Sequence, residues 1–177
     1  VMMMNDGVTI DPWGSSQSTD YSGIIDKFGL SSMESVTVPN PSKLHRRGVI
    51  FAHRDLDVVL ESKRKTEPFG VLTGLMPSGK MHLGHSMVID QVSWFQQQGG
   101  DVTIAVADLE SNATRGVSLS DGKKIAREEY VSNYAALGLD PEKTTVYFQS
   151  ERNIVQKLGF QLGKSCLLYT SPSPRDV

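Results

Sequence analysis

The second half of the chain alternates between short apolar runs and longer segments whose apolar residues recur with helical spacing. The runs predict buried strands, and the periodic segments predict amphipathic helices. The expected strands are 69–73, 102–107 and 144–148, and the expected helices are 85–98, 120–137 and 151–162. Three consecutive strand–helix units predict an α/β domain with a parallel sheet and right-handed crossovers. Because the strands are apolar throughout, we expect both faces of the sheet to be buried.

The first 66 residues show weaker patterns and predict an irregular N-terminal extension. Residues 1–19 lack periodicity, which is typical of an arm. The other expected elements are a helix at 21–30, a linker at 35–42 and a helix at 54–65. The chain therefore divides into three parts. They are the extension at 1–66, a sheet domain at 67–165 and a tail at 166–177.

The tail differs in character from the rest of the chain. Residues 166–176 resemble the conceptual translation of a common sequencing adapter, and the alternative is a genuine Ser/Pro-rich disordered tail. We leave it out of the fold prediction. Doing so removes Cys166, the only cysteine in the sequence, and with it any disulfide or cysteine nucleophile. An adapter would also mean that the gene was cut short.

The composition is that of a globular protein. Hydrophobic residues make up 38% of the chain and charged residues 21%, which argues against a disordered chain. With 18 basic and 20 acidic residues, the sequence has no basic footprint for nucleic acid. The chain has no apolar run that would span a bilayer and no signal-peptide pattern at its start. We therefore expect a cytoplasmic protein without a membrane partner.

The segment from Gly74 to His85 carries the candidate chemistry. It reads Gly-Leu-Met-Pro-Ser-Gly-Lys-Met-His-Leu-Gly-His and joins the first predicted strand to the first predicted helix. The free N–H groups and the dipole of a helix N-terminus attract anions such as phosphates. Because His82 and His85 are three residues apart, we expect both imidazoles on one side of the first helical turn. Gly84 leaves its backbone bare, which would let a base or ribose lie close to the chain.

Two other interpretations of this segment are open. Gly74 to Lys80 fits the Gly-x-x-x-x-Gly-Lys spacing of a P-loop NTPase. Against it, Met81 stands where a hydroxyl must hold Mg²⁺, and Pro77 removes one N–H donor from the loop. The second is that the two histidines are ordinary helix residues, which the surrounding glycines and turn disfavour.

Pro77-Ser78-Gly79 followed by His82-Leu83-Gly84-His85 resembles the ATP signature of class I aminoacyl-tRNA synthetases, in their tyrosyl/tryptophanyl branch. Three further segments resemble the archaeal-type tryptophanyl-tRNA synthetases. They are Asp-Pro-Trp-Gly at 11–14, Arg-Gly-Val-Ile-Phe-Ala-His-Arg-Asp at 47–55 and Ala-Asp-Leu-Glu at 107–110. The similarity covers about residues 9–164. It implies the first half of a Rossmann-like doubly wound parallel sheet, the catalytic domain of this class.

The resemblance implies a ligase that activates tryptophan with ATP and transfers it from the adenylate to tRNA(Trp). ATP is then a substrate, and Mg²⁺ is held through its phosphates with no metal ligand from the protein. His82 and His85 are the expected catalytic residues. Trp13 is expected either to form part of a lid over ATP or only to anchor the arm. The expected ATP-binding residues are Gly74, Pro77, Ser78, Gly79, His82, Gly84, His85 and Trp13.

The resemblance also implies an amino-acid pocket at Leu72, Ala105, Asp108 and Glu110. The two carboxylates are expected to bind the substrate ammonium or to order the exit of the second strand, and a turn or helix cap is the alternative for Asp108. Relatives usually carry tyrosine at the position of Leu72 and glutamine at that of Ala105, so this corner is larger and more apolar here. It therefore suits an indole better than a phenol, whose hydroxyl would be buried without a partner. Tyrosine is the alternative substrate.

The family's second signature, Lys-Met-Ser-Lys-Ser, has no match in the chain. We therefore expect the N-terminal fragment of a ligase that is homodimeric when full length, and we expect the fragment alone to be inactive. A catalytically dead paralogue that only binds adenine nucleotide is a further alternative.

Overall fold

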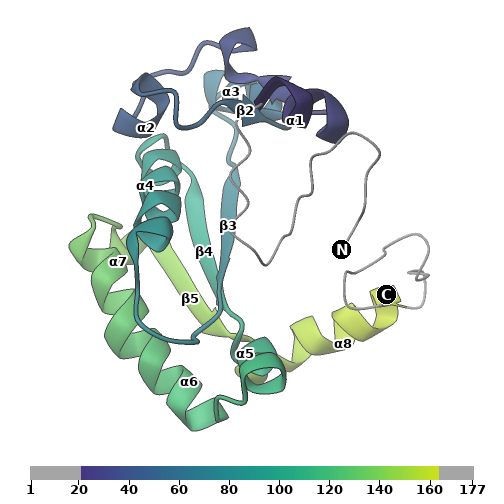
Figure 1. The fold of residues 1–177 in the computed structure, drawn as a ribbon, viewed down its shortest axis with the longest axis vertical. Helices are drawn as coiled ribbons and strands as arrows, with labels where there is room; N and C mark the ends of the chain where they lie inside the picture. Colours follow the sequence, from purple (N-terminus) through teal and green to yellow (C-terminus); the bar gives the residue numbers. More distant parts are fainter. Residues whose placement is uncertain (1–20, 164–177) are drawn as a thin grey trace.

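A three-stranded parallel sheet forms the centre of the computed structural model, which describes residues 21–163 (Figure 1). Its strands lie in the order β3 (Gly70–Leu75), β4 (Asp101–Val106) and β5 (Thr144–Phe148). The register pairs Leu75 with Val106 and Val106 with Phe148, so all three strands end at the same level. The predicted parallel sheet is confirmed, although β3 extends to Leu75 rather than ending at Thr73.

Helices follow each strand. After β3 comes α4 (Leu83–Gln97), and after β5 comes α8 (Asn153–Gly163). The predicted helix at 120–137 is confirmed, but it consists of α6 (Leu119–Ile125), a π-helical turn (Ala126–Val131) and α7 (Ser132–Ala136). Gly138 follows it with a φ of 95°, a left-handed conformation that suits glycine and ends the helix as predicted. The sequence did not predict α5 (Asp108–Arg115), which follows β4 directly.

The hydrophobic core lies on one face of the sheet. Side chains of α4 and of the helix containing the π-helical turn pack against alternate strand residues. The buried cluster consists of Leu75, Ile89, Val92, Val102, Ile104, Val106, Ala126, Tyr130, Tyr134, Leu139 and Phe148. On the other face, Leu72 is 72% exposed. The expectation of burial on both faces is therefore wrong for the described residues, because strand side chains alternate between faces and only one face is covered here.

The described part of the N-terminal extension lies at the amino ends of the strands (Figure 1). Trp94 near the end of α4 fixes it there, because its indole N–H donates to the Asn40 carbonyl at 2.9 Å and its ring contacts His45. Lys43 adds an ion pair with Asp90 at 3.0 Å. The elements of the extension are α1 (Tyr21–Phe28), β1 (Ser31–Ser32), a 3₁₀ turn (Met33–Ser35), α2 (Lys43–Arg46), β2 (Ala52–His53) and α3 (Leu56–Arg64).

The two helices predicted in the extension are confirmed with shorter bounds, as α1 and α3. The sequence did not predict α2 or the antiparallel pairing of β1 with β2. The arm that carries Trp13 and the tail after residue 163 lie outside the described residues. Within residues 21–163, no helix has both the length and the apolar character that crossing a membrane requires.

Gly100, at the entrance to β4, leads to a prediction about stability. A Cβ there would lie 2.6 Å from Phe69 Cε2 and 2.8 Å from Val71 Cγ2. We expect Gly100→Ala to lower the free energy of unfolding by about 1–3 kcal/mol, the usual cost of overpacking. The control is Gly159→Ala in α8, where a Cβ would meet nothing within 4 Å. Equal urea-denaturation midpoints for the two variants would contradict this account of the junction.

Candidate active site at the carboxyl edge of the sheet

The Gly74–His85 segment connects β3 to α4, as predicted. Leu75 ends β3, His82 precedes the first helical residue, and α4 begins at Leu83. Because β3, β4 and β5 end level with one another, the loops that follow them meet at one edge of the sheet. Ligands of open α/β sheets bind at this edge, and the free N–H groups at the start of α4 lie there too.

The two histidines lie together at this helix start. Their ring centroids are 3.9 Å apart, and the His82 backbone N–H donates to His85 Nδ1 at 3.3 Å. With Nδ1 accepting, the neutral His85 ring carries its proton on Nε2, where it can donate to a ligand. Burial lowers the pKa of His85, and the neighbouring His82 ring lowers it further, so His85 is uncharged at neutral pH.

Gly84 has a second role besides the bare backbone that the sequence suggested. A Cβ at this position would lie 3.1 Å from His82 Cε1 and 3.2 Å from His82 Nδ1. Any side chain would therefore crowd the imidazole. Gly79, by contrast, has open space around it, because a Cβ there would meet nothing within 4 Å.

The Pro77 turn of the loop is anchored from α5. Ser111 Oγ on α5 donates to the Pro77 carbonyl at 2.7 Å, and Ser111 is fully buried. Gly122 on α6 lies beside Pro77, whose Cγ would be in ordinary van der Waals contact, at 3.6 Å, with a Cβ at that position. Met81 packs against the hydrophobic core. A P-loop arrangement is therefore disfavoured, because the residue in the Mg²⁺-binding position is turned to the core.

Asp108 is buried at the end of β4, with 1% of its surface exposed. Its Oδ1 accepts the Ser150 backbone N–H at 3.0 Å, and its Oδ2 accepts the Ser150 hydroxyl. The carboxylate thus links the residues that follow β4 and β5. Glu110, which the sequence grouped with Asp108, is exposed on the first turn of α5.

Leu72 and Ala105 lie on the open face of the sheet. Gly74 is the register partner of Ala105, and Tyr147 of β5 is its partner on the other side. Arg152 lies over the Tyr147 ring, 4.9 Å from its centroid. Leu72, Gly74, Ala105 and Tyr147 together form a surface of small, apolar and aromatic residues, which we call the shelf. It ends at the same edge of the sheet as the histidine pair.

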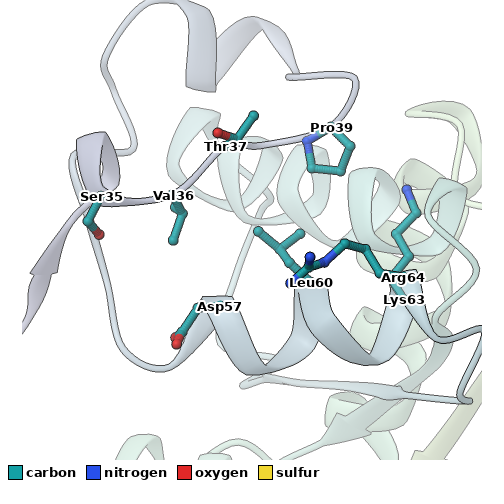
Figure 2. Close-up of a pocket in the computed structure, with 8 residues that line it drawn as sticks. All are labelled: Ser35, Val36, Thr37, Pro39, Asp57, Leu60, Lys63 and Arg64. Carbon is teal, nitrogen blue, oxygen red and sulfur yellow. The ribbon is translucent and has the colours of Figure 1, made fainter.

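A separate pocket lies away from the Gly74–His85 segment. It has a volume of about 520 Å³, and Figure 2 shows it between α3 and the segment 35–39. Its lining residues are Ser35, Val36, Thr37, Pro39, Asp57, Leu60, Lys63 and Arg64. None belongs to the Gly74–His85 segment. Since this pocket lacks convergent catalytic groups, we place the site at the histidine pair despite the pocket's size.

The basic side chains at the end of α3 are paired with neighbouring side chains. Lys63 donates to the Gln98 side chain, and Arg64 and Lys65 both pair with Glu61. Over the described range, no three His, Cys, Asp or Glu side chains gather in a group that would hold a metal ion.

Sequence reasoning placed residues 108–115 and 149–151 at this edge without singling out Ser111 or Ser150, and it did not include Tyr147. Ser111 stands one helical turn after Asp108, which is a usable signal once α5 is known. Ser150 lies two residues after the end of β5, where polar side chains at the carboxyl edge are to be expected. Tyr147 carries no signal of its own, because its place beside Ala105 depends on the strand register.

The family model for "tRNA synthetases class I (W and Y)" matches residues 63–164. The Tryptophan--tRNA ligase of Methanosarcina acetivorans is 44% identical over 156 residues, which cover 87% of this chain and 36% of that protein. Tryptophan--tRNA ligase 1 of Halobacterium salinarum is 43% identical over 160 residues, or 89% of this chain and 31% of that protein.

Among solved structures, the tryptophanyl-tRNA synthetase of Aeropyrum pernix matches with a TM-score of 0.74 and 40% identity, covering 86% of this chain and 44% of that one. The chain spans about a third of the length of the curated relatives it matches. The family model covers more than half of the chain, and its segment includes the sheet, the histidine pair and α5. The chain therefore belongs to the class I tRNA synthetases of the W and Y family.

Proposed function

We propose that this chain is the N-terminal part of a tryptophan–tRNA ligase and that the Gly74–His85 segment binds ATP. One observation carries the proposal. In a member of this family, two imidazoles and a helix N-terminus meet at the carboxyl edge of the parallel sheet. The relatives' names supply the choice of tryptophan. Tyrosine is the competing substrate within the same family.

In the proposed reaction, a carboxylate oxygen of tryptophan attacks the α-phosphorus of ATP. The new P–O bond forms as the bond to pyrophosphate breaks, leaving tryptophanyl-adenylate and free pyrophosphate. Negative charge builds on the α-phosphate oxygens during this displacement. His82, His85 and the free N–H groups of α4 are the donors that we propose for these oxygens, and donors placed in advance are worth most in the transition state.

The same proposal also includes a metal ion, a tRNA and a partner subunit. Mg²⁺ would be held through the ATP phosphates. The adenylate would pass its tryptophan to tRNA(Trp), and the full-length protein would act as a homodimer. The part of the relatives that this chain does not span would supply the remaining groups, so the chain alone is proposed to be inactive.

We propose the shelf of Leu72, Gly74, Ala105 and Tyr147 as the floor of the tryptophan site. Leu72, Gly74 and Ala105 are small or apolar and leave room for an indole. Exposed Glu110 is then the proposed partner of the substrate ammonium. Asp108 is proposed to link the residues that follow β4 and β5 rather than to bind the substrate, because both of its oxygens already accept hydrogen bonds from Ser150.

The first of three predictions from this proposal tests the proposed reaction. In a chimaera, residues 21–163 replace the matching segment of the Aeropyrum pernix relative. We expect tryptophan-dependent ATP–pyrophosphate exchange from this chimaera and none from the chain alone. Exchange that prefers tyrosine to tryptophan would overturn the assignment of the amino acid. A folded chimaera that binds ATP without exchange would favour a dead paralogue.

The second prediction concerns His85. In the same chimaera, His85→Ala should slow adenylate formation by about 10²–10³-fold, the usual cost of losing one preorganised donor. Tryptophan affinity should stay the same, because the lost interaction belongs to the transition state. His53→Ala, in the extension, is the matched control and should leave both quantities unchanged. Weaker tryptophan binding with an unchanged chemical step in His85→Ala would show that the role is wrong.

The third prediction separates Asp108 from Glu110. Asp108→Ala should lower the free energy of unfolding by about 1–3 kcal/mol, because it leaves the part-buried Ser150 N–H without its acceptor. Glu110→Ala, at an exposed position, should change stability less than Asp108→Ala does. It should instead raise the KM for tryptophan in the chimaera. Chemical denaturation and exchange kinetics check the pair, and the reverse pattern would contradict both assignments.

A further inference from the structure

An exposed cation at the carboxyl end of β5 has no role in the proposed reaction so far. Arg152 follows the 3₁₀ turn Gln149–Glu151 and comes directly before α8. Its guanidinium lies over the Tyr147 ring, 4.9 Å from the centroid. Within residues 21–163, no carboxylate forms an ion pair with this guanidinium. Arg152 therefore has both its charge and its N–H donors to offer to a ligand.

The backbone of Arg152 is held on both sides. Its N–H donates to the Gln149 carbonyl at 3.3 Å, and its own carbonyl accepts the Val155 N–H at 3.0 Å. Two residues earlier, Ser150 donates to both oxygens of the buried Asp108 carboxylate. The Arg152 side chain thus starts from a fixed position at the carboxyl edge of the sheet.

The Tyr147 ring places the Arg152 guanidinium on the open face of the sheet. Tyr147 is the register partner of Ala105, and Ala105 pairs in turn with Gly74, so these three residues form one row of the shelf. The next residue of β5, Phe148, points to the opposite face and belongs to the core cluster. Arg152 therefore lies at one end of the row that we propose as the floor of the tryptophan site.

An amino-acid substrate carries an ammonium and a carboxylate on the same carbon, so its site needs a group of each sign. Asp108 and Ser150 hydrogen-bond to each other across the ends of β4 and β5. Glu110, the proposed partner of the ammonium, and Arg152 each stand two residues beyond this pair, so an anion and a cation flank the same edge. A guanidinium that lies over an aromatic ring still has N–H donors for a carboxylate.

We propose that Arg152 binds the carboxylate of the substrate tryptophan. In this role the guanidinium holds one carboxylate oxygen by a charge-assisted hydrogen bond and leaves the other oxygen free to attack the α-phosphorus of ATP. Its positive charge also offsets the repulsion between the carboxylate and the triphosphate. This inference rests on the proposed function, because it names a further partner of the substrate within the same amino-acid site.

A purely structural role, in which the guanidinium only covers an aromatic ring, is the competing account. Arg127 provides the matched control. It is also exposed and also lies over an aromatic ring of β5, 5.2 Å from the Phe148 centroid. Because Phe148 belongs to the core cluster, Arg127 lies on the opposite side of the sheet from the shelf. The loss of a ring contact alone should therefore affect the two arginine positions alike.

The first measurement titrates the full 177-residue chain with tryptophan and with tryptamine, which has the same indole and ammonium groups but no carboxylate. The amide signals of Gly74 and Ala105 are followed by ¹⁵N NMR. We expect Arg152→Gln to raise the Kd of tryptophan about 10-fold, the cost of one charge-assisted hydrogen bond, and to leave the Kd of tryptamine unchanged. Arg127→Gln should change neither Kd.

Three results of this titration would overturn the proposal. One is an equal loss of affinity for both probes in Arg152→Gln. Another is an equal effect of the two variants, including no effect of either. The third is that tryptophan leaves the two amide signals of the unaltered chain in place.

The second measurement is tryptophan-dependent ATP–pyrophosphate exchange in the chimaera. Arg152→Gln should raise the KM for tryptophan about 10-fold and leave the KM for ATP unchanged, whereas a structural loss at the edge of the sheet would affect both substrates. An unchanged KM for tryptophan would contradict the assignment. An unaltered chimaera without exchange would count against the proposed function, and the comparison of tryptophan with tryptamine in the chain would still decide the role of Arg152.

Discussion

The level alignment of the three strand ends determines where the loops that follow the strands lie. Backbone hydrogen bonds fix Leu75, Val106 and Phe148 in one row across the sheet. The loops that follow must then leave from the same edge, although they lie more than 70 residues apart at the extremes. A shift of one residue in this register would turn the side chains of a strand to the opposite face. The histidine pair, Asp108 and Ser150 would no longer share one site.

Helix α5 links the neighbouring loops at this edge. Asp108 at its start accepts from Ser150 after β5, and Ser111 one turn later donates to Pro77 after β3. Both side chains are buried, and a buried polar group that loses its partner is costly. The Gly74–His85 segment is thus held from the side by α5. Preorganisation of this kind is what a site needs when its task is to stabilise charge in a transition state.

The sequence predicted the parallel sheet, α4, the helix at 120–137 and its glycine stop, because these depend on local periodicity and on one backbone conformation. It placed His82 and His85 correctly at a helix start for the same reason. It missed α5, whose sequence Asp-Leu-Glu-Ser-Asn-Ala-Thr-Arg has too few apolar residues to show a helical pattern. The contacts of Ser111 with Pro77 and of Ser150 with Asp108 span 34 and 42 residues, so only the tertiary structure reveals them. The sequence could not predict the exposure of Leu72 either, because an apolar strand has the same sequence pattern whether or not its second face is covered.

The central claim is that the Gly74–His85 segment at the start of α4 is the nucleotide site. A crystal structure of the chain grown with a non-hydrolysable ATP analogue tests it most directly. Our account predicts the triphosphate against the first turn of α4, within hydrogen-bond reach of the His85 imidazole. An analogue bound instead in the pocket between α3 and residues 35–39, with the histidine pair untouched, would contradict it.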